Sequence, residues 1–171
     1  KIYNRLGYRQ GLTKLSSCQK QEIDRYINEA GRFLTLKGSG RRIKIINRSP
    51  KAVELCGGII FKSSLLFSVF ENASELVLLG ATAGKKIIKA IEGSKEKDLT
   101  RGVVFDAVAS ESVDLCLEWI SAYFNRELKR ENKQLNSKRI SSGYGDFSLE
   151  NQKIIYELLN LKKLEVSLTD E

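Results

Sequence analysis

The residues best suited to chemistry lie in segment 139–145, which reads Arg-Ile-Ser-Ser-Gly-Tyr-Gly. Glycine on both sides of Tyr144 lets the backbone come close to a ligand with its amides exposed. Arg139 can form a forked pair with a carboxylate, and Tyr144 supplies a stacking face and a hydroxyl group. Such a loop suits a small zwitterion that carries an aromatic base. The alternative is that Gly-Tyr-Gly is a simple turn, which is the commoner role of such a sequence.

A second group of candidates is acidic and falls on a predicted long helix. It comprises Asp106, Asp114 and Glu118. Asp114 and Glu118 are four residues apart, so they share one face of the helix. A carboxylate that faced the 139–145 loop could bind an ammonium group. The alternative is a solvated acidic helix face without a ligand.

Other kinds of chemistry are disfavoured by composition. The sequence has no histidine, and its cysteines, Cys18, Cys56 and Cys116, are far apart and form no Cys-x-x-Cys pair. Zinc needs clustered ligands, so no metal site is expected. Without histidine, Ser-His-Asp and Cys-His arrangements are excluded, and we predict no catalytic residue. The cysteines are interpreted as small buried side chains in a reducing compartment.

Two glycine-containing segments resemble nucleotide-binding loops only superficially. The segment at residues 80–86, Gly-Ala-Thr-Ala-Gly-Lys-Lys, has three residues between its glycines and no Ser or Thr after the lysine. A phosphate loop needs four residues there and a hydroxyl for magnesium, so we predict a tight strand-to-helix turn. Gly38-Ser39-Gly40 lacks a third glycine and is interpreted as a hairpin turn.

The length and net charge of the chain limit the class of protein to which it can belong. The 171 residues, 42% hydrophobic and 29% charged, predict one domain over residues 1–171. No apolar run is long enough for a membrane span, and residues 1–5 do not resemble an export signal, so we expect a cytoplasmic protein. The net charge of +8 could steer the chain toward an acidic protein. Nucleic-acid binding is not expected, because no aromatic residues interleave with the basic run that ends near residue 140.

Hydrophobic periodicity and turn residues predict both helices and strands. Ser16 and Gln19 form a capping box, Ser63 or Ser64 caps a second helix, Gly93 ends a third, and Ser148 caps the last. The predicted helices cover residues 18–33, 65–70, 87–91, 100–131 and 149–159, and residues 132–145 form a loop. The predicted strands cover residues 33–37, 42–46, 59–61, 76–79 and 164–168, with 76–79 a buried central strand. The elements mix without a regular βαβ rhythm, so we predict an α+β fold with a mixed or antiparallel twisted sheet and flanking helices.

Several segments together resemble the activation domain of cobalamin-dependent methionine synthase, in its stand-alone form. The family signature is an arginine, three residues and Gly-Tyr, which matches Arg139, Gly143 and Tyr144. This chain has Gly145 where the family often has proline, which makes the loop less rigid. The family also continues with further sheet beyond the position of Glu171. The other similar segments are residues 6–9, 78–84, 106–110, 149–159 and 166–170.

The resemblance implies an S-adenosylmethionine-binding protein that caps the cobalamin domain of methionine synthase in trans. An electron from flavodoxin or an equivalent reductase would convert cob(II)alamin to cob(I)alamin, which takes the methyl group of S-adenosylmethionine. The cobalamin would be held by the partner, since this chain has no histidine to ligate it. Two alternatives remain: an activator of another corrinoid methyltransferase, and a basic interaction module without a ligand. The implied S-adenosylmethionine-binding residues are Asp114, Arg139, Ser141, Ser142, Gly143, Tyr144 and Gly145.

Overall fold

The computed structural model describes residues 1–94, 96–136 and 138–168. The chain divides into two compact units, each built from two separate stretches of sequence. The first unit comprises Lys1–Gly38 and Ala81–Trp119, and the second comprises Ser39–Gly80 and Ile120–Glu171. Long elements pass from one unit into the other.

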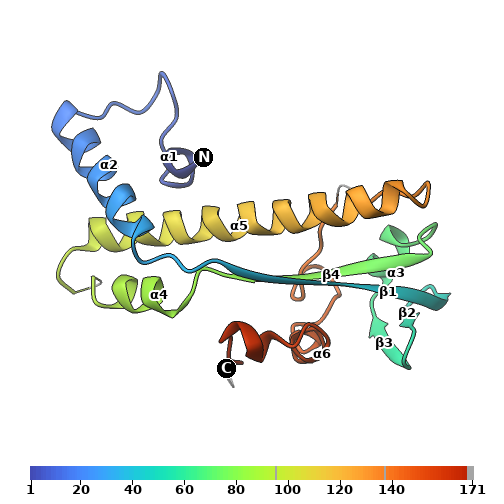
Figure 1. The fold of residues 1–171 in the computed structure, drawn as a ribbon. Helices are drawn as coiled ribbons and strands as arrows, with labels where there is room; N and C mark the ends of the chain where they lie inside the picture. The colour runs from blue at the N-terminus through green and yellow to red at the C-terminus, as the bar shows by residue number, and fades with distance from the viewer. Residues whose placement is uncertain (95, 137, 169–171) are drawn as a thin grey trace. The chain divides into compact units, whose positions relative to one another are not determined.

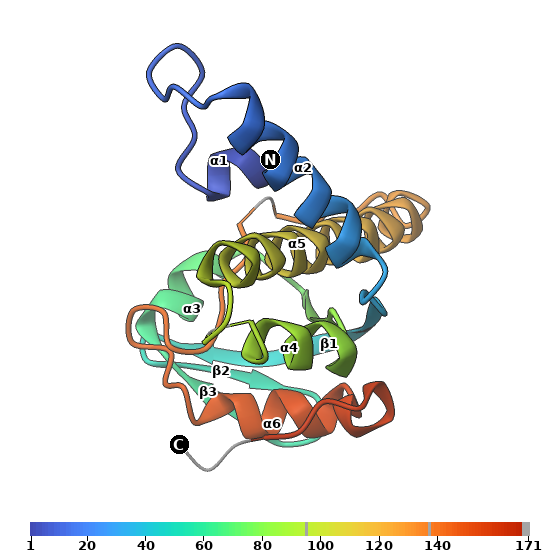
Figure 2. The ribbon, with the colours of Figure 1, turned by 90° about the vertical axis from the view of Figure 1, so that its left-hand side faces the viewer.

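The first unit is helical, and its core lies around the first half of α5 (Leu99–Lys129). Helices α2 (Ser17–Gly31) and α4 (Lys85–Glu92) pack against this half of α5 from two sides (Figure 2). The buried residues they contribute include Tyr26, Ala30 and Ile87, which meet Phe105 of α5. A short helix, α1 (Ile2–Arg5), lies at the N-terminal end.

The second unit is built on a four-stranded sheet with the order β3-β2-β1-β4 (Figure 1). Antiparallel pairing joins β1 (Lys37–Ser49) to β2 (Ala52–Leu55), and β2 to β3 (Ile59–Lys62). Strand β4 (Glu75–Thr82) lies on the other side of β1. Helices α3 (Ser64–Val69) and α6 (Asn151–Leu158) pack on the sheet through a second apolar core. The prediction of an α+β fold with an antiparallel sheet and flanking helices is confirmed.

Most of the predicted helices are confirmed, since local signals define them. The capping box of α2 forms as expected, with Ser16 Oγ accepting from Gln19 N at 3.2 Å and Gln19 Oε1 accepting from Ser16 N at 2.9 Å. Ser63 caps α3, and Gly93 ends α4. Segment 80–86 is the predicted strand-to-helix turn, because β4 ends at Thr82 and α4 begins at Lys85.

The predicted hairpin at Gly38-Ser39-Gly40 is wrong, because β1 continues without a break through these residues. Gly40 is instead a position of close packing. A Cβ atom added there would collide with the ring of Phe124 and lie 3.0 Å from Ile120 Cγ2. Glycine therefore lets the second half of α5 pack directly against the strand. The turn actually lies at Pro50 and Lys51, followed by β2, a strand that we did not predict.

Three predictions near the sheet also need correction. The apolar run at residues 76–79 belongs to β4, which is an outer strand of the described sheet and not a central one. Residues 164–168 form no strand. Leu161–Leu164 is a 3-10 helix, and Tyr156 Oη donates to Val166 O at 3.0 Å, which folds this segment back toward α6. Ser148 Oγ accepts from Glu150 N before the helix begins, so it does not cap α6.

Among the described residues, no helix is both long and apolar enough to cross a membrane.

Candidate functional site

The loop predicted to bind a ligand belongs to the second unit, and its two ends are anchored in the core of that unit. Ile140 packs against the sheet cluster at one end. Phe147 is buried at the other end, with its ring edge-on to Phe61 at a centroid distance of 5.3 Å. The residues between these anchors form a compact turn on the surface. Loops held at both ends by a rigid framework are common positions for binding residues.

Hydrogen bonds within the loop define a tight turn, and Tyr144 points away from it into solvent. Gly143 N donates to Phe147 O at 2.7 Å, and Phe147 N donates to Tyr144 O at 3.1 Å. Gly143 and Gly145 adopt left-handed φ angles of 88° and 60°, which side-chain-bearing residues rarely adopt. Tyr144 is 70% exposed. The two glycines therefore present the tyrosine to solvent on a well-defined backbone.

Asp146 fastens the loop to the start of α3, a role that the sequence analysis missed. Its carboxylate accepts hydrogen bonds from Ser63 Oγ at 2.5 Å, Ser64 N at 2.6 Å, Ser64 Oγ at 2.5 Å and Leu65 N at 3.2 Å. The hydrogen bonds from Ser63 and then from Ser64 hold the pKa of Asp146 well below its usual range. Two adjacent serines before a short helix, with an acid after a glycine turn, are the sequence signal that could have indicated this pairing.

We predict that Asp146→Asn lowers stability near neutral pH but not in strong acid. Because the pKa of Asp146 is depressed in the folded state, its contribution is present above the carboxyl pKa of the unfolded chain, about 4. That contribution is lost as the pH falls through the lower folded value. The gap between the urea midpoints of the parent and the variant should therefore narrow steadily as the pH is lowered from 4 to 2. Asp106→Asn, at an exposed position, is the control, and an equal gap at every pH would contradict the assignment.

Several polar groups of the loop have no partner among the described residues. Arg139 is exposed, and its guanidinium forms neither a hydrogen bond nor an ion pair there. The hydroxyl of Tyr144 is likewise unpaired. Ser142 Oγ is buried and also has no partner within the described structure. Buried hydroxyl groups are usually hydrogen-bonded, so Ser142 Oγ is available as a donor or acceptor.

Asp114 belongs to the first unit, where it has a partner of its own. Arg5 Nη2 contacts Asp114 Oδ2 at 2.6 Å, and Arg5 Nε donates to Glu111 Oε1 at 2.9 Å. Lys1 similarly pairs with Glu118 at 3.2 Å. The acidic face of α5 thus pairs with Arg5 of α1 and with Lys1, which precedes that helix. The structure brings the predicted residues from Arg139 to Gly145 together in one loop, and the meeting of Asp114 with that loop stays a prediction.

The cysteines differ from the prediction of three buried side chains. Cys18 and Cys56 are exposed, Cys116 is half-buried, and all three are free. Within the described ranges, no group of three or more His, Cys, Asp or Glu residues is placed to hold a metal ion.

A surface depression of about 550 Å³ in the first unit is the other candidate site. All the residues that line it come from α2 and from Arg32, which directly follows this helix, and their charges are mixed. A depression along a single helix lacks the convergent walls that enclose a small ligand. Its lining residues are Gln21, Asp24, Arg25, Asn28, Glu29 and Arg32.

No protein-family model matches the sequence, and no curated protein matches it significantly.

Proposed function

We propose that this chain binds S-adenosylmethionine through residues 139–145 and caps the cobalamin domain of a B12-dependent methionine synthase in trans. In this role it supports the reductive remethylation of cob(II)alamin to methylcobalamin. The observation that carries the proposal is a set of groups on an anchored loop that have no partner among the described residues: the guanidinium of Arg139, the hydroxyl of Tyr144 and Ser142 Oγ. The resemblance of Arg139, Gly143 and Tyr144 to the family signature supports it.

The groups of the loop fit the parts of S-adenosylmethionine. The guanidinium of Arg139 suits the methionine carboxylate, because a forked pair has both charge and geometry in its favour. The exposed ring of Tyr144 suits the adenine base. Ser141 and Ser142 add hydroxyl groups that can accept or donate. An ammonium group at Asp114 would have to compete with Arg5, which now holds that carboxylate.

The role that we propose for this chain is to position the methyl donor. Bound S-adenosylmethionine supplies the methyl group, and the partner's corrinoid supplies the nucleophile. The residues of this chain bind and orient the donor. Holding two reacting groups in the right orientation raises their effective molarity and therefore the reaction rate. The net charge of +8 favours encounter with an acidic partner, either the cobalamin-binding subunit or a flavodoxin-like reductase.

We expect Arg139→Ala to weaken the binding of S-adenosylmethionine by about tenfold or more, because the charge-assisted contact to the carboxylate is lost. Isothermal titration calorimetry of the parent and the variant measures this. Arg126→Ala is a matched control, since Arg126 is also exposed and has no partner among the described residues. Equal affinity of Arg139→Ala and the parent, or no binding by the parent, would overturn the proposal and favour an interaction module without a ligand.

The partner is identified by a reactivation assay. A methionine synthase that lacks its own activation domain is incubated in the cob(II)alamin state with this chain, a reductant and S-adenosylmethionine. We expect turnover to return with the parent chain and not with Arg139→Ala. Binding of S-adenosylmethionine without recovered turnover would instead direct the search to another corrinoid methyltransferase.

A further inference from the structure

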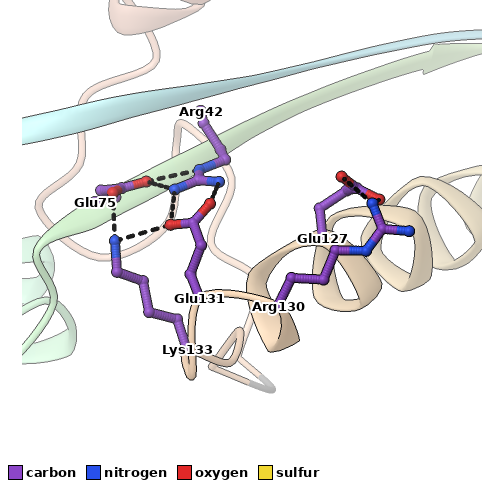
Figure 3. Close-up of polar contacts among 6 residues, drawn as sticks. All are labelled: Arg42, Glu75, Glu127, Arg130, Glu131 and Lys133. Carbon is purple, nitrogen blue, oxygen red and sulfur yellow. Dashed lines mark hydrogen bonds and ion pairs between the residues drawn. The ribbon is translucent and has the colours of Figure 1, made fainter.

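Four charged side chains of the second unit form one network, which we call the clasp (Figure 3). It comprises Arg42 of β1, Glu75 of β4, and Glu131 and Lys133, which follow α5. Arg42 donates to Glu75 at 2.7 Å and to both carboxylate oxygens of Glu131 at 2.6 and 2.9 Å. Lys133 Nζ donates to Glu75 at 2.8 Å and to Glu131 at 3.2 Å. Each carboxylate therefore contacts both cations.

The clasp differs from an ordinary surface ion pair chiefly in connectivity. The side chains of Arg42 and Glu75 are 26% and 13% exposed, and those of Glu131 and Lys133 are 43% and 39% exposed, so the network extends from a partly buried pair to the surface. Arg42, and after it Lys133, lowers the pKa of Glu131 to about 2. Lone exposed pairs contribute little, but networks of several charges with good geometry hold their members in place.

The clasp lies where the chain reverses direction between α5 and the loop of residues 139–147, which we call the ligand loop. Asn132 adopts a left-handed φ of 55°, and Lys133 N donates to Leu128 O at 2.9 Å. Leu135 N then donates to Asn125 Oδ1 at 3.2 Å, which returns the chain beside the last turns of α5. In the described part of segment 132–139, Lys133 is the residue that forms ion pairs. The clasp thus ties the entrance of the loop to two strands of the sheet.

The far end of the loop is tied independently, by Phe147 in the core and by Asp146 at α3. Arg139 stands between the two attachments and makes no contact of its own with a described charge. Its position therefore depends on the chain on both sides of it, which is held by Ile140 in the core and by the clasp at Lys133. A flexible entrance would spread the guanidinium over many positions, and the apparent affinity falls with the fraction of molecules in the competent one.

We infer that the clasp is a positioning device for the ligand loop, in which Arg42, Glu75, Glu131 and Lys133 hold the entrance so that Arg139 is placed before the ligand arrives. The part of this inference that concerns the ligand rests on the proposed function. The part that concerns the order of the loop does not, so the two can be tested separately.

The first test needs no ligand. Hydrogen–deuterium exchange is measured by mass spectrometry on the parent, Glu131→Gln and the control Glu127→Gln, which removes the neighbouring pair drawn in Figure 3. We expect Glu131→Gln to speed exchange in peptides covering residues 133–142, with peptides of α2 and α4 unchanged. Glu127→Gln should leave segment 133–142 as in the parent. Unchanged exchange in Glu131→Gln, or an equal increase throughout the chain, would overturn the inference. If Glu131→Gln does not fold, the same exchange measurement is made on Lys133→Gln.

The second test separates positioning from general stabilisation by a double-mutant cycle on the affinity for S-adenosylmethionine. Glu131→Gln alone should weaken binding about three- to tenfold, since the competent population falls. In the Arg139→Ala background it should have little further effect, because the group that the clasp positions is gone. Independent, multiplicative losses would show that the clasp does not act through Arg139. If the parent chain binds no S-adenosylmethionine, the proposed function fails, and the exchange measurement still decides whether the clasp orders the loop.

Discussion

Phe147→Ala is expected to lower the free energy of unfolding by about 3–5 kcal/mol, the usual cost of removing a buried phenylalanine ring. Phe147 is 3% exposed and packs edge-on against Phe61, which is 1% exposed. Its removal leaves a cavity in the core of the second unit and releases the C-terminal anchor of the ligand loop. Chemical denaturation followed by circular dichroism measures the loss. S-adenosylmethionine binding should weaken in the same variant, because the loop is no longer held at that end.

Two variants make this test specific. Tyr144→Ala removes a neighbouring aromatic ring that is 70% exposed, so its effect on stability should be within about 0.5 kcal/mol. Phe147→Leu keeps much of the buried volume and should cost well under half as much as Phe147→Ala. A small effect of Phe147→Ala, comparable with that of Tyr144→Ala, would show that the loop is not anchored in the core.

Gly40→Ala is expected to cost about 1–3 kcal/mol of unfolding free energy, the range observed when a methyl group is forced into a well-packed core. The added Cβ would collide with the ring of Phe124 and lie 3.0 Å from Ile120 Cγ2, and both residues belong to the second half of α5. Either the helix moves away from β1 or the Phe124 ring takes a poorer rotamer. Urea denaturation is a suitable measurement, because the midpoint reports the change directly.

The cause of the Gly40→Ala effect can be checked with two further variants. Gly31→Ala adds the same methyl group at the end of α2, where a Cβ would have no atom within 4 Å. It should be neutral or stabilising, since alanine is the better helix former. Phe124→Leu shortens the side chain that opposes Gly40, so Gly40→Ala should cost less in that background than in the parent. Equal costs in both backgrounds would mean that the contact with Phe124 is not the reason.

The features that could be predicted from the sequence depend on residues close together in the chain. The capping box of Ser16 and Gln19, the cap at Ser63 and the stop at Gly93 each involve positions within a few residues of one another. The apolar periodicity of α5 is likewise a local property, and the helix was predicted to within two residues at each end. The α+β class follows from the elements that such signals define.

The errors arose where a local pattern has two interpretations and a distant residue chooses between them. Gly38-Ser39-Gly40 has the composition of a turn, yet the approach of Phe124 from α5 uses Gly40 inside a strand. The alternating residues 164–168 have the pattern of a strand, but Tyr156 holds Val166 in an irregular segment. The apolar run of β4 suggested a central strand, although pairing places it at the outside of the described sheet.

The candidate site also has some features that the sequence predicts and others that depend on distant residues. The sequence by itself predicted which residues of the loop are suited to binding a ligand, because arginine, tyrosine and paired glycines have chemical properties that are independent of context. Only the tertiary structure decided how that loop is held: by Asp146 on the start of α3, by Phe147 against Phe61, and by the clasp at its entrance. These contacts join residues up to about 90 positions apart, and hydrophobic periodicity, which reports on neighbours within a few turns, contains no information about such pairings.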